Sequence, residues 1–260
     1  ASVTVKAALE QLGADVTVIS RSGPDDYGHL DRHADAQIIA NTTPVGMYPH
    51  NGAAAYYDGL VYVDLSKIKP MIAMPFHPSN TYTIDEVNAN LKDILHDVEQ
   101  KALVSLDGAV EYSLQDKIRD GKLYVEQGII AGCAGGGFEN ICAAAEIIKG
   151  KNIGSDAFTF SVYPASTPVY MELVRNGAVA DLMAAGTIVK TAFCGPCFGA
   201  GDTPANNAFS IRHSTRNFPN REGSKLQSGQ ISSVALMDAR SIAATAANKG
   251  FRPGTYPWRR

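Results

Sequence analysis

The chain has 260 residues, which is enough for one large domain or two modest ones with a true hydrophobic core. Hydrophobic residues make up 45% of it and charged residues 19%, a composition typical of folded globular proteins and not of disordered ones. The net charge is -3 and no dense run of Lys or Arg occurs, which argues against nucleic acid or a membrane surface as a partner.

Targeting signals and the number of cysteines further restrict the class of protein. No apolar run approaches the roughly 20 residues that a membrane span needs, and no secretory signal opens the chain. Four cysteines are too few for a disulfide scaffold in a chain of this length, so a metal-binding or catalytic role is the better expectation for them. We expect a cytoplasmic protein.

The first fifty residues indicate an incomplete α/β pattern. Helical spacing over residues 2–12 is followed by short β-branched strands at 16–20 and 36–40, and the second strand runs into the polar loop 41–47. Gly, Ala and Tyr without periodicity over residues 49–57 then indicate a junction.

From residue 60 onward, predicted strands and helices alternate. A capping box from Thr83 to Glu86 predicts the start of a long amphipathic helix, and Ser166-Thr167-Pro168 predicts another helix start. The expected strands are 60–65, 124–131, 158–162 and 188–192, and the expected helices are 83–102, 138–149, 166–177, 178–185 and 238–248. This alternation predicts an α/β fold with a three-layer α/β/α arrangement, in which a mostly parallel sheet is covered on both faces.

Three cysteines fall in loops that follow predicted strands. Cys133 comes after strand 124–131, and Cys194 and Cys197 come after strand 188–192 in a tight Cys-Gly-Pro-Cys turn. Ligands collect beyond the carboxyl ends of parallel strands, so the three thiols would converge if the two strands were neighbours. Three protein ligands leave one position of a metal centre open to water or substrate, whereas a closed site uses four.

Each cysteine also has an ordinary interpretation. An isolated Cys-x-x-Cys can be a redox pair, half of a zinc site or two packed thiols. Cys133 can be a small buried residue after a strand, and we interpret Cys142, in the middle of an Ala-rich predicted helix, as a core residue.

The sequence around the cysteines favours a metal site. The segment Thr191–Gly199 (TAFCGPCFG), followed by Ser214–Arg221 (STRNFPNR), resembles the aconitase superfamily, in which a CGPC loop precedes an RNF-x-x-R segment. The order and separation of Cys133, the CGPC loop and the two arginines fit as well. The resemblance runs from about residue 58 to residue 250 and corresponds to the third domain of that family.

This resemblance implies a [4Fe-4S] cluster held by Cys133, Cys194 and Cys197, whose fourth iron acts as a Lewis acid on the hydroxyl group of a di- or tricarboxylic acid. Arg216 and Arg221 match family positions that hold substrate carboxylates, a task suited to the guanidinium group.

Two departures from the family pattern indicate a divergent branch and leave the substrate open. Gly132-Cys133-Ala134-Gly135 stands in place of the usual Ser-Cys-Thr-Asn, and Thr215 stands where many members have Asn.

The resemblance also implies that part of the machinery lies elsewhere. The family's catalytic base is a Ser on a separate C-terminal domain, and further His and carboxylate groups come from upstream domains, for which 260 residues leave no room. His213 could approach the site, although a His in a polar loop is more often a bystander. We therefore expect the cluster-binding portion of a hydro-lyase, inactive by itself, whose missing aconitase domains could lie in another chain.

The first fifty residues resemble a different family. Residues 16–21 (VTVISR) and 41–47 (NTTPVGM) are similar to part of the NADP domain of shikimate dehydrogenase, a Rossmann-like fold. The resemblance implies Arg21 as the partner of the 2′-phosphate of NADP and Ser20 as a hydroxyl donor. The Gly-rich turn that receives the pyrophosphate is absent, so NADP should bind poorly.

The sequence thus predicts three parts: a partial dinucleotide-binding-like segment (1–52), an aconitase-type iron–sulfur domain (53–250) and a tail (251–260). The alternative functions are an NADP-dependent shikimate dehydrogenase and a non-catalytic fragment or fusion.

Overall fold

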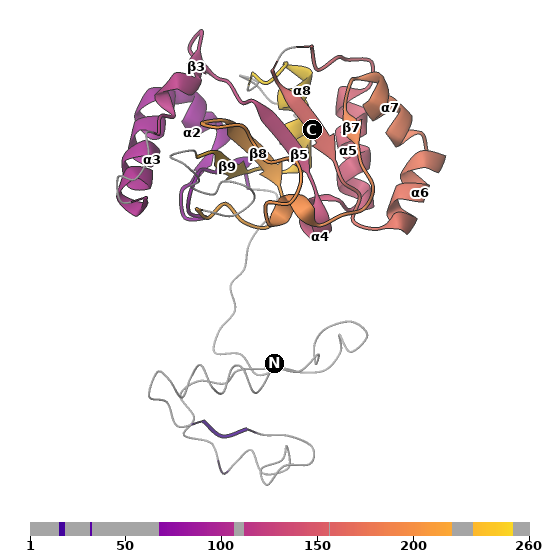
Figure 1. Ribbon diagram of the computed structural model, residues 1–260, viewed down its shortest axis with the longest axis horizontal. Coiled ribbons are helices and arrows are strands. Elements are labelled where there is room, and N and C mark those ends of the chain that lie inside the picture. Colours follow the sequence, from indigo (N-terminus) through magenta and orange to yellow (C-terminus); the bar gives the residue numbers. More distant parts are fainter. Residues whose placement is uncertain are drawn as a thin grey trace. The chain divides into compact units, whose positions relative to one another are not determined.

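The computed structural model describes residues 16–18, 32, 68–106, 112–155, 157–219 and 231–251. The chain divides into two units, residues 1–67 and 68–260, and the elements described below belong to the second (Figure 1). The predicted junction between residues 52 and 53, the strand 60–65 and the tail beyond Phe251 lie outside the described residues and stay predictions. Within the described ranges, no helix is long and apolar enough to cross a lipid bilayer.

The described strands form one large sheet and one small hairpin. The strands of the large sheet are β1 (Met71–Ala73), β2 (Thr81–Thr83), β5 (Gln127–Ile130), β6 (Thr159–Val162), β7 (Ile188–Val189), β8 (Phe209–His213) and β9 (Ser233–Leu236), and the hairpin consists of β3 (Ile118–Arg119) and β4 (Lys122–Leu123). The large sheet has the order β2-β1-β9-β8-β5-β6-β7. Strands β9, β8, β5, β6 and β7 run parallel, whereas β1 pairs antiparallel with both β2 and β9.

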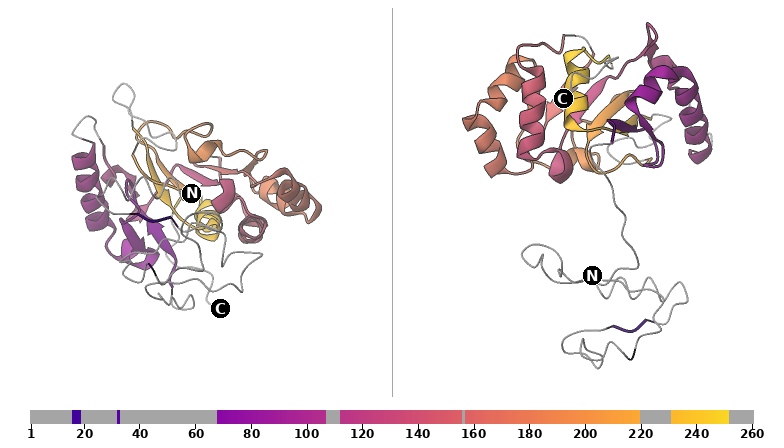
Figure 2. Two further views of the ribbon diagram at one scale, coloured as in Figure 1. Left: turned by 90° about the horizontal axis from the view of Figure 1, so that it is seen from below. Right: turned by 180° about the vertical axis from the view of Figure 1, so that it is seen from behind.

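Helices connect these strands in the described part of the chain. They are α2 (Ile84–Ala89), α3 (Leu91–Ser105), α4 (Gly132–Gly135), α5 (Phe138–Ile148), α6 (Thr167–Arg175), α7 (Ala178–Ala184) and α8 (Ala239–Ala247), with the short 3-10 turns η3 (Gln115–Lys117) and η4 (Gly195–Cys197). Figures 1 and 2 show α2 and α3 beside the end of the sheet that holds β2 and β1, and α6 and α7 beside the opposite end. The predicted α/β class with a mostly parallel sheet is confirmed.

Side-chain caps begin three of these helices where the sequence signals lie. The Thr83 hydroxyl accepts a hydrogen bond from the Glu86 amide (3.2 Å), and the Glu86 carboxylate accepts one from the Thr83 amide (2.7 Å), which completes the predicted capping box. The Ser166 hydroxyl accepts a hydrogen bond from the Val169 amide at the start of α6, and Asp238 accepts from two amides at the start of α8. Each cap satisfies backbone donors that the first helical turn leaves unpaired.

One predicted helix is wrong in its extent. The spacing over residues 83–102 predicts a single helix, but Asn90 adopts φ -128° and ψ 38°, which is not helical, and it separates α2 from α3. Asn favours such breaks because its side chain competes with the backbone for hydrogen bonds.

The two faces of the central strands differ in chemistry. Side chains alternate along a strand, and Ile129 lies in register with Ser161 on one side and with Arg212 on the other. One face, which we call the helix face, carries Gly128, Ile130, Phe160, Val162, Phe209 and Ile211. Helix α8 packs on the helix face: a Cβ atom added at Gly128 would lie 3.0 Å from Cγ2 of Ile242. The opposite face, which we call the polar face, carries Gln127, Ile129, Ser161, Ser210 and Arg212.

Candidate functional site

Cys133 lies directly beyond the carboxyl end of β5. The strand ends at Ile130, and Gly132 then takes a positive φ of 69° to start the one-turn helix α4. A Cβ atom at Gly132 would lie only 2.8 Å from the Sγ of Cys197, so a glycine is required here for both the backbone angle and the space. Cys133 itself is exposed.

Cys194 and Cys197 lie on one tight turn, as predicted. The Cys197 amide donates to the Cys194 carbonyl oxygen (3.1 Å), and the Phe198 amide donates to the Gly195 carbonyl oxygen (3.0 Å), which closes the 3-10 turn η4. Cys194 is exposed and Cys197 is buried. Phe193 and Phe198 flank the turn with half-exposed rings that meet edge to face, 6.2 Å between centroids.

The two cysteine-bearing segments meet although their strands are not neighbours. Strand β6 lies between β5 and β7, so the condition that the two strands are neighbours is not met. The segment after β7 instead turns back across the polar face, and η4 contacts α4 where the Cys197 sulfur lies against Gly132. The carboxyl edge of the parallel sheet is thus the meeting point, in keeping with the usual position of ligand sites in such sheets.

The donor types at this edge fit an iron–sulfur cluster, because such clusters are held by cysteine thiolates. Among the His, Cys, Asp and Glu side chains of the described residues, no group of three or more is close enough to hold a metal ion. The ligand set of Cys133, Cys194 and Cys197 therefore stays a prediction, supported by the contact between their segments.

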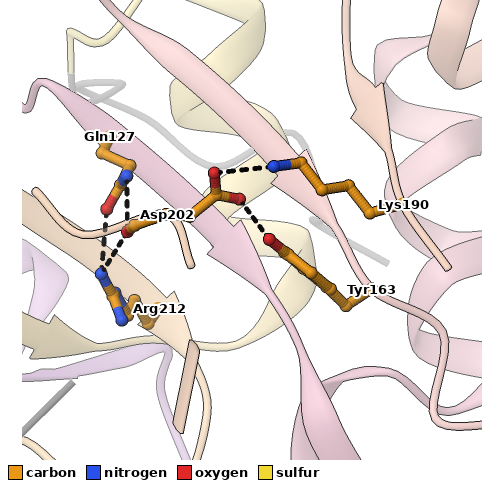
Figure 3. Close-up of polar contacts among 5 residues, drawn as sticks. All are labelled: Gln127, Tyr163, Lys190, Asp202 and Arg212. Atoms are coloured by element: carbon orange, nitrogen blue, oxygen red, sulfur yellow. Dashed lines mark hydrogen bonds and ion pairs between the residues drawn. The ribbon is translucent and has the colours of Figure 1, made fainter. Parts of the chain in front are cut away.

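A fully buried arginine lies beneath the cysteine turn, and the sequence pattern had not singled it out. Arg212 donates from Nε to Ser210 Oγ (3.0 Å), from Nη1 to the Pro196 carbonyl oxygen (2.7 Å), and from Nη2 to Gln127 Oε1 (3.1 Å) and the Asp202 carbonyl oxygen (3.0 Å). Figure 3 shows its contacts with Gln127 and Asp202. The alternation of apolar and polar residues over Phe209–His213 is the signal that could have identified this strand and the inward position of Arg212.

The Asp202 carboxylate forms the other half of the same network (Figure 3). It accepts hydrogen bonds from the Tyr163 hydroxyl (2.8 Å) and from the Lys190 ammonium (3.0 Å). Burial alone would raise the pKa of Asp202, but hydrogen bonds from Tyr163, Lys190 and Ser161 outweigh it and lower the pKa below 3.8. The pKa of Lys190 is raised in turn, chiefly by its hydrogen bond to Asp202.

The segment after β8 carries the predicted carboxylate-binding arginines. Arg216 is exposed. Its neighbour Asn217 is buried and donates from Nδ2 to the carbonyl oxygens of Met74 (2.6 Å) and Ala73 (3.3 Å), which ties the segment to β1. Arg221 lies outside the described residues, as do Ser20 and Arg21 with the loop 41–47 that suggested NADP.

Two further residues, His213 and Cys142, have clear positions in the fold. His213 ends β8 against α4, and among the described groups its buried Nδ1 atom has no hydrogen-bond partner. Burial lowers the pKa of His213 below 6.5, although the Asp238 carboxylate partly opposes this. Cys142 lies on α5, half-buried against the main core, where its sulfur accepts a hydrogen bond from the Asn176 side chain (3.1 Å).

Known proteins match this chain over most of its length. A sequence model described as the aconitase family (aconitate hydratase) matches residues 27–244, a range that includes the three cysteines, Arg216 and Arg221. The 3-isopropylmalate dehydratase large subunit of Clostridioides difficile (strain 630) is 28% identical over 198 residues, which cover 75% of this chain and 37% of that protein. The protein of the same name from Campylobacter jejuni (strain RM1221) is 34% identical over 194 residues, which cover 74% of this chain and 39% of that protein. The chain therefore spans less than two-fifths of the length of these relatives.

Proposed function

The chain belongs to the aconitase family, and from this premise we propose that it is the cluster-binding portion of an aconitase-type hydro-lyase. The observation that carries the proposal is the contact at the carboxyl edge of the sheet between the Cys197 sulfur and the backbone at Gly132, the residue before Cys133. Two segments about sixty residues apart in the sequence meet there, and each carries thiols of the kind that hold iron–sulfur clusters.

In this proposal Cys133, Cys194 and Cys197 hold a [4Fe-4S] cluster. When bound, such a cluster with one iron free of protein ligands supplies a Lewis acid for the departing hydroxyl group of a hydroxy acid. The exposed positions of Cys133 and Cys194 leave that side of the site open to a small molecule. The buried Cys197 faces the protein, so it would anchor the site to the fold.

The substrate class follows from the positive charge beyond β8. Arg216 and Arg221 would each bind a carboxylate with paired hydrogen bonds, which favours an acid with at least two carboxyl groups. Asn217 supports this role, because its hydrogen bonds to the backbone of β1 fix the segment that carries Arg216.

The remaining catalytic groups would come from protein segments other than these 260 residues. Relatives named 3-isopropylmalate dehydratase large subunit are more than twice as long as the part that aligns, and their name implies a small-subunit partner. We expect the proton-abstracting base to lie in such additional domains or in a partner subunit. The 260-residue chain alone should therefore bind the cluster without turning over substrate.

Anaerobic reconstitution with iron and sulfide tests the proposal. The wild-type chain should become brown, with broad visible absorption and about four irons per chain, the content of one cluster. The Cys194→Ser variant should stay colourless with normal folding. Cys142→Ser is the matched control, because this fourth thiol lies on α5 and should leave the cluster content unchanged. A folded wild-type chain that takes up no iron and sulfide would overturn the proposal.

Turnover is a separate measurement. Citrate, isocitrate, methylcitrate and 3-isopropylmalate should each remain unchanged by the reconstituted chain alone. Dehydration of one of them should appear when the missing domains are supplied. Turnover by the isolated chain would show that the base lies within it, and cluster binding without turnover under any combination would favour the non-catalytic alternative.

A further inference from the structure

We propose that Arg212 is a positioning residue for the cysteine turn: with Gln127 and Asp202 it forms a clamp that holds Cys194–Cys197 ready for a ligand. The clamp is defined as these three residues: the Arg212 and Gln127 side chains donate hydrogen bonds to carbonyl oxygens of the segment 196–202, and Asp202 is the last residue of that segment. The inference rests on the proposed function only in taking this turn as the cluster-binding one. The clamp itself can be tested on the protein without metal.

The first attachment lies inside the Cys-x-x-Cys turn. Arg212 Nη1 donates to the Pro196 carbonyl oxygen at 2.7 Å, a short and therefore strong hydrogen bond for a charged donor. That carbonyl belongs to the peptide group that joins Pro196 to Cys197. A hydrogen bond to it restrains the orientation of this peptide plane, and with it the backbone from which the Cys197 side chain extends. Arg212 is fully buried, so water does not compete for the interaction.

The second attachment lies where the segment leaves the site. The Asp202 carbonyl oxygen accepts from Arg212 Nη2 (3.0 Å) and from Gln127 Nε2 (3.0 Å). The Asp202 carboxylate is held by Tyr163 and Lys190. Side chains from β5 and β8, from the end of β6 and from just beyond β7 thus converge on one loop residue. The loop is tied to four neighbouring strands of the sheet, and a sheet is a rigid support.

The guanidinium geometry explains why this residue is an arginine. Its planar fork directs donors along several fixed directions at once, and in Arg212 the Nε, Nη1 and Nη2 atoms all donate. Lysine could not reproduce the arrangement, because its three donors radiate from a single nitrogen. A buried charged side chain contributes little to stability compared with an apolar one of similar size. Its donors to the loop backbone therefore point to a role in placing the loop.

The burial of Cys197 is the measurable consequence of the clamp. In the full 260-residue chain, freed of metal and reduced, iodoacetamide should modify the exposed Cys194 quickly and the buried Cys197 slowly. We expect Arg212→Met to raise the alkylation rate of Cys197, relative to that of Cys194, at least about tenfold. This is the size of effect expected when a hydrogen bond from a charged donor is lost. Arg212→Lys should give an intermediate value. Mass spectrometry of cysteine-containing peptides at successive times gives both rates in the same sample.

Lys117→Met is the matched control. Lys117 is also a buried cation of this unit, paired with Glu126 at 2.8 Å, but the pair lies at the amino end of β5. Loss of this ion pair should reduce the stability of the protein, while the alkylation of Cys197 stays slow. A Cys197 rate in Arg212→Met equal to that of wild type, or an equal acceleration in Lys117→Met, would overturn the proposal. Should Arg212→Met fail to fold, Gln127→Met carries the test: it removes one link of the clamp, and an unchanged Cys197 rate would equally overturn it.

Iron retention gives a second readout that separates this inference from the proposed function. After reconstitution, Arg212→Met should lose iron to a chelator several-fold faster than wild type, while Lys117→Met should match wild type. If wild type binds no iron, the proposed function fails, yet the alkylation contrast still decides whether the clamp exists. If wild type binds iron and Cys197 alkylation is the same in all variants, the clamp fails and the proposed function stands.

Discussion

The two faces of the central sheet are both buried, but they are built from different chemistry. Phe160, Val162, Phe209 and Ile211 on the helix face are 0–1% exposed, and Ser210 and Arg212 on the polar face are 0% exposed. These residues alternate along the same strands. Burial therefore does not distinguish the faces. The helix face packs against α8 through apolar contacts, whereas the polar face binds the backbone of the cysteine turn through directional hydrogen bonds.

This difference indicates a division of tasks within one sheet. Apolar burial is non-directional and accounts for most of the stability of a domain. Hydrogen bonds depend on distance and angle, so they specify where the bound segment lies while adding less net stability. Substitutions on the helix face should change stability most, and substitutions on the polar face should change the loop most.

Phe160→Ala should have the largest effect on stability. Removing a fully buried aromatic ring costs about 3–5 kcal/mol, because the lost burial and the resulting cavity add together. Urea unfolding followed by circular dichroism measures the change. Its neighbour Ser161, on the polar face, is the matched control: Ser161→Ala should cost no more than about 1 kcal/mol. Equal losses at both positions would contradict the proposed division.

Gly135→Ala should cause the second-largest loss of stability. A Cβ atom there would lie 2.1 Å from the carbonyl oxygen of His213, so α4 must move away from β8. Overpacking of this kind costs about 1–3 kcal/mol. Gly137→Ala is the control, since its Cβ atom would meet only the Asn140 amide, at 3.9 Å. Comparing urea midpoints and the iron content after reconstitution shows whether α4 must sit closely against β8. No difference between the two variants would argue against that requirement.

Asp202→Asn should have a smaller effect that depends on pH. The pKa of this carboxyl is lowered below 3.8 in the folded protein, so the ionised group stabilises the fold above that pH. The contribution disappears as the pH falls through the folded-state pKa. At neutral pH the variant should lose about 1 kcal/mol, and the difference from wild type should shrink in acid. Urea midpoints at pH 7, 4 and 3 would measure this, and a constant difference would contradict the assignment.

His213→Asn should have the smallest effect on stability, and this effect should appear near neutral pH rather than in acid. Burial lowers the pKa of His213 below 6.5, so the folded protein keeps the ring neutral where the unfolded chain binds a proton. Wild type should therefore lose stability as the pH falls below 6.5, by less than about 1 kcal/mol for a partly buried group. The variant should lack this component. Unfolding midpoints between pH 7.5 and 5 test it, and identical slopes would show that His213 does not contribute.

Local signals in the sequence predicted local structure well. The cap residues Thr83, Ser166 and Asp238 begin helices as expected, because a cap depends on neighbours within a few residues. The mostly parallel sheet was predictable for a related reason, since strand–helix alternation restricts how strands can be joined. Asn90 shows the limit: apolar spacing continues through it, although the helix does not.

The polar face could not be predicted in the same way. Strands β8 and β9 were not among the expected elements, although the alternation of apolar and polar residues over Phe209–His213 is a signal for β8. Nothing in the sequence near Arg212 indicates that its partners are Pro196, Asp202 and Gln127, which approach it only through the sheet order. The insertion of β6 between the two cysteine-bearing strands was equally hidden, since strand order depends on long-range packing.

Both bonds from Arg212 to the cysteine segment end on main-chain carbonyl oxygens, at Pro196 and Asp202. Every amino acid carries such an oxygen, so these hydrogen bonds do not depend on most of the side chains between Pro196 and Asp202. The outward-facing positions of the turn, such as Phe198, can thus be exchanged over evolutionary time without releasing it. Hydrogen bonds to the backbone therefore let the exposed side chains of this turn change while the cysteines keep their position.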